Sequence, residues 1–252
     1  MNPILRLDGV SKRFGGVVAA DEVSFSVMSG EVQGLIGPNG AGKSTIMNLI
    51  SGIYTPDAGR IFLDEEDISS WPSHERARHG IGRTFQTPRF LQRSNIRDNL
   101  LLGTDLGKQP GYLKSYFSKP YTDFEDNLNE LMEVARFSFN WDDDITALLY
   151  GQRKTLEIVR SMLANPRVML VDEPAAGLNN VEIEHAMDLL NLAAKRGIGV
   201  LLIEHSMDMI MNICKQIVVI NFGKVIASGT PTEVSSNDEV IEAYLGRSLE
   251  DA

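Results

Sequence analysis

The segment Gly37-Pro38-Asn39-Gly40-Ala41-Gly42-Lys43-Ser44-Thr45 follows the apolar run of residues 32–36 and fits the pattern G-x-x-x-x-G-K-[ST]. In such a loop the glycines let backbone N–H groups converge on one anion, the lysine adds a cation for the β- and γ-phosphates, and the serine hydroxyl can bind Mg²⁺. A helix starting at about Lys43 and ending before Gly52 would point its positive dipole end at the same phosphates. The segment therefore predicts a nucleoside triphosphate site. The alternative is a ligand-free, glycine-rich turn between strand and helix.

Composition limits the classes of protein that fit this chain. Its 252 residues suffice for one large α/β domain. A formal net charge of −10 argues against a protein that neutralises nucleic-acid phosphates. The single cysteine, Cys214, excludes an internal disulfide and is expected to be a small core side chain. No apolar run approaches the ~18 residues of a membrane span, and the first seven residues lack signal-peptide features, so we expect any membrane role to come through a partner.

Short apolar runs bounded by turn residues recur along the chain and alternate with helical spacing. This order predicts an α/β fold with a mostly parallel core sheet. The expected strands are residues 4–7, 23–27, 32–36, 61–63, 168–171, 200–203 and 217–220. The last three are apolar on both faces, as buried parallel strands are, and should form the centre of the sheet.

A different pattern separates the early strands from the late ones. From about Arg89 to Ala164 the β-branched runs disappear, which predicts an inserted helical subdomain. Thr122 and Glu125 form an expected capping box for a helix that ends near residue 136. Residues 103–120 are rich in Gly, Pro, Ser and Lys and should form a surface loop. Two further helix starts are expected at residues 230–233 and 236–239.

A second chemical signal is the pair Asp172-Glu173 at the end of the apolar strand 168–171. Beside a phosphate-binding loop, a carboxylate at a strand end can hold the Mg²⁺ shell, which suits Asp172. The next carboxylate can orient or deprotonate an attacking water, which suits Glu173. Taken alone, adjacent acids after a strand are more often a solvated turn.

The order of motifs resembles the ATP-binding subunits of ABC transporters, over nearly the whole chain. After the phosphate-binding loop come Thr84-Phe85-Gln86-Thr87 at the Q-loop, Leu148-Leu149-Tyr150-Gly151-Gln152 at the signature, Asp172-Glu173, Ala176-Gly177-Leu178-Asn179 at the D-loop, and Glu204-His205 at the switch histidine. The resemblance implies ATP and Mg²⁺ as ligands and a P-loop NTPase fold of the ABC type with an N-terminal antiparallel β portion. The chain is then one domain, with a nucleotide-binding core at residues 1–86 and 165–252 and a helical subdomain at residues 87–164.

The resemblance also implies roles for single residues. Gln86 should reach Mg²⁺ and the attacking water, and His205 should donate to the γ-phosphate in the transition state. Phe14 matches the aromatic residue that stacks on adenine; the alternative is an ordinary core phenylalanine. Together with Glu173, Gln86 and His205 form the expected catalytic set, with Ser44, Gln86 and Asp172 at the metal.

The signature departs from the family pattern Leu-Ser-Gly-Gly-Gln. Leu149 replaces the serine and Tyr150 the first glycine, while Gly151 and Gln152 remain. In the family this segment closes over the γ-phosphate held by the opposing subunit. Since losing a transition-state donor can cost ~3 kcal/mol, we expect the composite site that uses this signature to be weakened. If the second ATPase subunit is a different protein, the other site could carry most of the turnover.

Within that family the chain most resembles the ATPase subunits of branched-chain amino acid importers, at residues 14–16, 34–43, 83–88, 175–179 and 203–205 and in the insertion at 103–120. This implies ATP-driven import of branched-chain amino acids or related small polar compounds. The implied partners are a second ATPase subunit, identical or not, transmembrane permease subunits and, indirectly, a substrate-binding protein, with no nucleic acid. The implied location is peripheral, on the cytoplasmic face of the inner membrane. The alternatives are a non-transport ABC ATPase and a weakly catalytic nucleotide-binding module.

Overall fold

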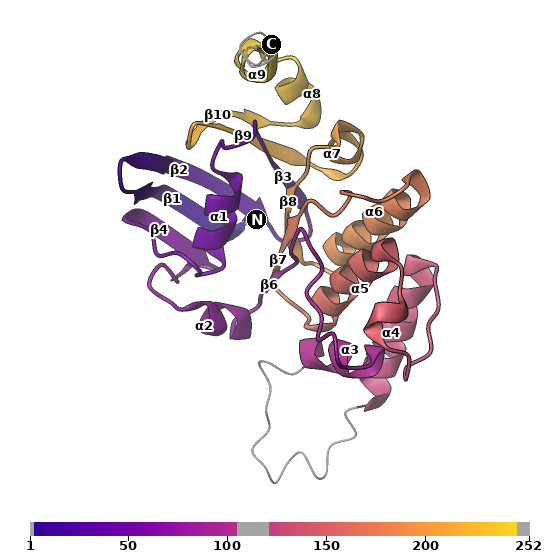
Figure 1. Cartoon of the computed structure of the whole chain (residues 1–252). Helices are drawn as coiled ribbons and strands as arrows, with labels where there is room; N and C mark the ends of the chain where they lie inside the picture. The colour runs from indigo at the N-terminus through magenta and orange to yellow at the C-terminus, as the bar shows by residue number, and fades with distance from the viewer. Residues whose placement is uncertain (1–2, 105–120, 246–252) are drawn as a thin grey trace.

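The first of two sheets is antiparallel and begins the chain (Figure 1). The computed structural model describes residues 3–104 and 121–245. Strands β1 (Pro3–Phe14) and β2 (Val17–Met28) pair along most of their length, and β4 (Ala58–Leu63) and β5 (Glu66–Asp67) extend the sheet in the order β2-β1-β4-β5. The implied N-terminal antiparallel β portion is therefore confirmed.

The second sheet is mostly parallel and carries the segments that are predicted to bind the ligand. Its order is β10-β9-β3-β8-β7-β6, and only β9 and β10 pair antiparallel. The strands are β3 (Val32–Ile36), β6 (Ile81–Arg83), β7 (Val168–Asp172), β8 (Gly199–Ile203), β9 (Gln216–Asn221) and β10 (Lys224–Gly229). The predicted strands 32–36, 168–171, 200–203 and 217–220 are confirmed. Strands β6 and β10 were not predicted from the sequence.

Helices surround the sheets, and one group of them fills the stretch between β6 and β7 (Figure 1). That group consists of α3 (Ile96–Thr104), α4 (Tyr121–Ala135), the 3₁₀ turn η1 (Ile145–Ala147) and α5 (Tyr150–Leu163). The others are α1 (Lys43–Ile50), α2 (Ser73–Arg78), α6 (Asn180–Lys195), α7 (Met207–Ile213), α8 (Pro231–Ser235) and α9 (Asp238–Leu245). The helical character expected after residue 89 is present.

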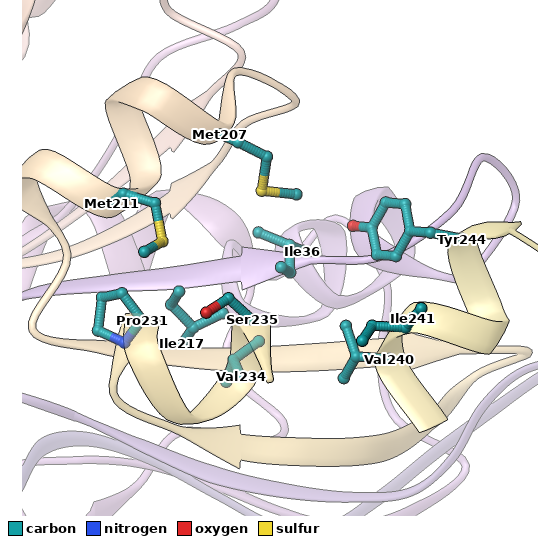
Figure 2. A pocket seen from close by; sticks show the side chains of 10 residues that line it. All are labelled: Ile36, Met207, Met211, Ile217, Pro231, Val234, Ser235, Val240, Ile241 and Tyr244. Atoms are coloured by element: carbon teal, nitrogen blue, oxygen red, sulfur yellow. The ribbon is translucent and has the colours of Figure 1, made fainter. Parts of the chain in front are cut away.

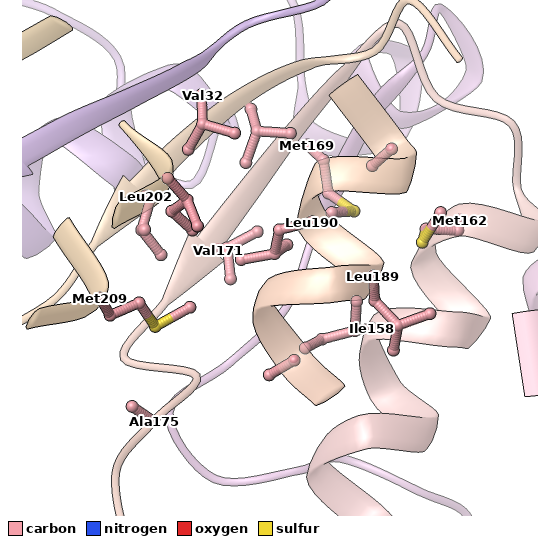
Figure 3. Packing of buried hydrophobic residues seen from close by; sticks show 14 of the residues in the cluster. Val32, Ile158, Met162, Met169, Val171, Ala175, Leu189, Leu190, Leu202 and Met209 are labelled. Atoms are coloured by element: carbon pink, nitrogen blue, oxygen red, sulfur yellow. The ribbon is translucent and has the colours of Figure 1, made fainter. Parts of the chain in front are cut away.

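Two separate cores pack on the two faces of the parallel sheet. In β7, Val168 and Leu170 pack with α1 and the antiparallel sheet, whereas Met169 and Val171 pack with α5 and α6. This alternation follows from the period of two along a strand. Figure 3 shows the second core, in which Val171 lies beside Leu190 of α6 and Leu189 lies near Ile158 of α5. As a result α1 and α5 lie on opposite faces of the sheet.

Helix α2 was not expected from the sequence, and its main contribution is one buried arginine. The Arg76 guanidinium is 1% exposed and donates to the carbonyls of Leu49 (2.5 Å) and Ile50 (2.9 Å) at the end of α1. These carbonyls lack partners within their own helix, so Arg76 takes the place of a C-terminal cap. Burial lowers the pKa of Arg76 to about 10, which still leaves it charged at neutral pH.

The remaining local predictions have mixed outcomes. Both C-terminal helix starts are confirmed: Thr230 and Glu233 form the capping box of α8, and Asn237 accepts from the Val240 N–H at the start of α9. A helix ending at residue 135 is present as expected, whereas the side chain of Thr122 lies outside the described residues. The predicted loop 103–120 is wrong at its first two residues, which end α3, and residues 105–120 lie outside the described part of the chain.

Candidate active site

The phosphate-binding loop connects β3 to α1 at the carboxyl edge of the parallel sheet. Gly42 has φ 110°, and a Cβ atom there would lie 2.4 Å from the Ala19 carbonyl oxygen, so only glycine fits. Lys43 is 7% exposed, and its Nζ donates to the carbonyl oxygens of Gly37 (2.7 Å) and Pro38 (3.0 Å). The loop thus holds a buried cation beside the first turn of α1, where Ser44 is exposed.

Three of the predicted catalytic side chains meet at the same edge of the sheet. Glu173 follows β7 and is half-buried; its Oε2 accepts from Gln86 Nε2 at 2.8 Å, and its Oε1 lies 3.2 Å from His205 Nε2. Gln86 and His205 come from the segments after β6 and β8, the two neighbours of β7. Crevices at the carboxyl ends of parallel strands are where α/β proteins bind ligands. A carboxylate, an amide and an imidazole held together there can position and deprotonate a water.

Asp172, the predicted metal ligand, is the last residue of β7. Its Oδ2 lies 3.8 Å from Arg83 Nη2, and its backbone N–H donates to Thr84 Oγ1 at 3.3 Å. Burial raises the pKa of Asp172, whereas the charges of Arg83 and Lys43 lower it. The carboxylate is therefore partly desolvated and exposed to the field of the phosphate-loop lysine.

Glu204 is a supporting residue to which the sequence analysis gave no role. It is 4% exposed, and its carboxylate accepts from the backbone N–H groups of Ala175 (2.6 Å), His205 (2.8 Å) and Ser206 (3.1 Å). The buried carboxylate of Glu204 therefore holds two segments together: the turn that contains His205 and the segment that follows Glu173. Its position directly before His205 was the only available signal.

The signature segment forms the start of α5. Leu149 is the N-cap residue and is 69% exposed, and its backbone N–H donates to Gln152 Oε1 at 2.9 Å. Leucine has no side-chain acceptor, so only half of a reciprocal capping box is present. Leu149 therefore presents an exposed apolar side chain at the position where the family pattern has a serine.

The signature and the D-loop pack against each other. The Tyr150 ring lies against Gly177, where a Cβ atom would be 3.0 Å from Tyr150 Cε1. A Cβ atom on Gly151 would lie 2.1 Å from Glu182 Oε1, so any side chain there would displace the Glu182 carboxylate. Glu182 also forms the capping box of α6, in which Asn179 Oδ1 accepts from its N–H at 3.1 Å. Asn179, the predicted D-loop residue, is thus held next to the signature.

Phe14, the predicted adenine-stacking residue, ends β1 and is 42% exposed. Its ring meets Tyr54 edge-on with centroids 5.0 Å apart, and Lys12 Nζ lies 5.7 Å from the ring centroid. An exposed ring can take a stacking partner, which a fully buried core phenylalanine could not. The core interpretation of Phe14 therefore does not fit.

A groove of about 670 Å³ lies between α2, β6 and the helices α3 and α5. Its lining contains one carboxylate, that of Glu157, and four arginines: Arg78, Arg83, Arg160 and Arg167. Glu157 is 2% exposed and accepts from the Arg89 N–H at 3.4 Å, while Arg160 donates to the Arg89 carbonyl at 2.8 Å. The floor of the groove is thus attached to the segment that carries Gln86.

Burial raises the pKa of Glu157 from its ordinary 4.5 to about 7. The folded protein then binds more protons than the unfolded chain between these two values, so stability falls as pH rises from 4.5 to 7 and levels off above. We expect Glu157→Gln to unfold like the wild type at pH 4.5 and to gain up to about 3 kcal/mol at pH 8. Thermal unfolding of both proteins between pH 4.5 and 8 checks this expectation. If the stabilities of the two proteins changed with pH in the same way, the raised pKa of Glu157 would be contradicted.

An apolar pocket of about 320 Å³ lies between α7, α8 and α9, next to the strand that leads into the phosphate-binding loop (Figure 2). Ile36 of β3 forms part of its wall, and Met207, Met211 and Ile241 line it although each is more than 40% exposed. Tyr244 of α9 also lines the pocket; burial raises the pKa of its phenol, whereas the backbone N–H of Gly37 lowers it. Helix α9 therefore lies close to the first glycine of the loop.

Comparisons with known proteins identify the family of this chain. The family described as "ABC transporter" matches residues 20–176, and the one described as "Branched-chain amino acid ATP-binding cassette transporter" matches residues 224–249. The chain is 40% identical to the high-affinity branched-chain amino acid transport ATP-binding protein BraF of Pseudomonas aeruginosa, covering 97% of this chain and 98% of the relative. It is 37% identical to LivG of Salmonella typhimurium, a protein of the same description, with the same coverage.

Among solved structures, an ATP-binding cassette of an ABC transporter in its ADP conformation superposes with a TM-score of 0.83 at 32% identity. The alignment covers 98% of this chain and 100% of that one. The fold and the family matches thus agree with relatives that extend over almost the full length of the chain. The chain belongs to the ABC transporter ATPases, within the group of branched-chain amino acid transport ATP-binding proteins.

Proposed function

We propose that this ATPase powers an importer for branched-chain amino acids or related small polar compounds, as the names of its relatives indicate. The observation that carries the catalytic part is the meeting of Glu173, Gln86 and His205 at the sheet edge that bears the phosphate-binding loop. In the proposed reaction, water attacks the γ-phosphorus and ADP leaves. Glu173 accepts the proton of the water, and His205 and Lys43 stabilise the charge on the phosphoryl oxygens.

Magnesium is proposed as the accompanying ion. Ser44 offers a hydroxyl, Gln86 an amide oxygen and Asp172 a carboxylate, and these oxygen donors fit a hard cation. Within residues 3–104 and 121–245 there is no cluster of three or more His, Cys, Asp and Glu side chains that could hold a metal. This suits Mg²⁺, which protein sites usually bind through one or two carboxylates plus substrate phosphates. When bound, it would neutralise charge on the β- and γ-phosphates.

The position of the signature supports a head-to-tail pair of ATPase subunits. The phosphate-binding loop leads into α1 on one face of the parallel sheet, whereas Leu149–Gln152 begins α5 on the other face. An exposed signature on that face suits the nucleotide of an opposing subunit better than its own. We therefore propose two ATP molecules between two cassettes, as the family pattern implies, with this chain paired to an identical or a related ATPase.

We expect Leu149→Ser to raise ATP hydrolysis in the assembled complex, because a hydroxyl would add a donor for the γ-phosphate of the opposing subunit. The same serine would complete the capping box of α5 and stabilise the fold by about 1 kcal/mol. Steady-state rates measured in one purified complex test the first effect, and thermal unfolding of the isolated subunit tests the second. A more stable protein with an unchanged or lower rate would mean that Leu149 does not weaken the signature.

The groove is proposed as the docking site of a permease helix on the cytoplasmic side. Its arginines outnumber its one carboxylate, so it favours a segment with acidic side chains around an apolar centre. Since Arg160 and Glu157 both hold Arg89, three residues after Gln86, docking there would act on the active site. No helix within the described parts of the chain is both long and apolar enough to cross a bilayer. Docking would therefore place this subunit peripherally on the inner membrane.

Transport in vesicles tests the proposed function. The ATPase, its co-purified permease subunits and a binding protein are reconstituted with ATP on the side of this subunit, and uptake of labelled leucine is measured. We expect uptake that requires ATP and fails with Glu173→Gln. Hydrolysis without uptake of any branched-chain amino acid would favour a non-transport ABC ATPase. Nucleotide binding without hydrolysis would favour the weakly catalytic module.

A further inference from the structure

Lys154 is a buried cation that the proposed mechanism does not use. It lies one turn into α5, after the signature residue Tyr150, and is 4% exposed. Its Nζ donates to the carbonyl oxygen of Glu173 at 2.5 Å and lies 3.5 Å from that of Pro174. Burying an ammonium group is costly unless its hydrogen bonds are satisfied. Its position therefore needs a reason beyond packing.

The backbone of Glu173 is the part of the active site that Lys154 contacts. Glu173 has φ 47°, in the left-handed region, which is strained for a residue with a side chain. Its N–H donates to the Ile203 carbonyl at 2.9 Å, so β8 holds one end of the residue. The lysine holds the carbonyl at the other end. These two bonds set the direction in which the carboxylate points toward Gln86 and His205.

The backbone of Lys154 belongs to α5, the helix that begins with the signature. Its side chain also reaches the signature, because Nζ lies 5.8 Å from the centroid of the Tyr150 ring. That ring packs on Gly177, four residues after Glu173. Burial lowers the pKa of Lys154, whereas the surrounding carboxylates, Glu204 and Glu173 foremost, raise it. A small displacement of the start of α5 would therefore move both Tyr150 and the ammonium that holds the Glu173 carbonyl.

We infer that Lys154 is a positioning residue that links the signature of this subunit to the general base of the same subunit. This inference rests on the proposed dimer, in which the signature contacts the ATP of the opposing subunit. Closure of the signature on that ATP then sets the direction of Glu173 in this subunit's own site. Each site becomes fully active only when the other is occupied, which makes hydrolysis cooperative in ATP.

The test compares Lys154→Met, Lys154→Gln and Lys154→Arg with the wild type in the assembled complex. Methionine keeps the length of the stem without the charge, glutamine keeps one amide donor, and arginine keeps the cation. We expect Lys154→Met to bind ATP normally, to lose at least about tenfold in kcat and to show a Hill coefficient close to 1. Lys154→Arg should recover much of both quantities. Lys195→Met, an exposed lysine at the end of α6, is the matched control and should behave as the wild type.

Several outcomes would overturn the inference. One is a Lys154→Met variant with wild-type kcat and cooperativity. Another is an equal loss of kcat in all three variants together with a lowered unfolding temperature, because that identifies a purely structural role. If Lys154→Met fails to fold, Lys154→Gln decides in its place. In a Glu173→Gln background, Lys154→Met should cause no further loss of rate. A wild type that neither binds nor hydrolyses ATP would instead refute the proposed function, so the two failures are distinguishable.

Discussion

Replacing Glu173 by glutamine should slow ATP hydrolysis by at least about a hundredfold and leave ATP binding close to that of the wild type. The amide has the shape of the carboxylate and can keep a hydrogen bond to Gln86 or His205, which lie 2.8 and 3.2 Å from the two carboxylate oxygens. It cannot accept the proton of the attacking water. The phosphate-binding loop, which supplies the affinity, is unchanged in this variant.

Three measurements check this result on the same protein. Single-turnover hydrolysis gives the rate of the chemical step, titration with ATP gives the affinity, and gel filtration with ATP and Mg²⁺ reports a trapped dimer. Glu184→Gln makes the same chemical change on the exposed face of α6 and should leave all three as in the wild type. A turnover within threefold of the wild type would remove Glu173 from the role of general base.

The expected catalytic set was predicted from the order of the family's motifs, and for Glu173 also from the apolar strand that precedes it. Gln86, Glu173 and His205 come after β6, β7 and β8, and parallel strands that pair side by side bring their carboxyl ends to one edge. The order of the motifs therefore indicated that these three side chains would lie close together. Strand β6 itself, with three residues, was too short to be predicted from the sequence.

The supporting residues could not be predicted, because their roles depend on contacts between distant segments. Arg76, Lys154 and Glu204 are charged side chains that would be expected on the surface, yet each is less than 5% exposed and binds backbone groups of another segment. No local spacing marks such a residue. The division into a core and a helical subdomain at residues 87–164 likewise remains a prediction.

Lys43→Ala should abolish most ATP binding without weakening the fold. The ammonium is 7% exposed and donates to two carbonyls of its own loop, so it is held where the β- and γ-phosphates are expected. A hydrogen bond to a charged group contributes about 1.5–3 kcal/mol, so losing the lysine should weaken ATP binding about a hundredfold. Lys224→Ala, at an exposed lysine of β10, is the control and should bind ATP as the wild type does.

Thermal unfolding with and without ATP separates this effect from misfolding. At an ATP concentration about 100 times the dissociation constant, binding stabilises the wild type by about 2.7 kcal/mol. A hundredfold weaker variant gains only about 0.4 kcal/mol at the same concentration. Lys43→Ala should therefore unfold near the wild-type temperature without ATP and show almost no shift with it, whereas Glu173→Gln should show the full shift. A full shift in Lys43→Ala would mean that the nucleotide does not bind at this loop.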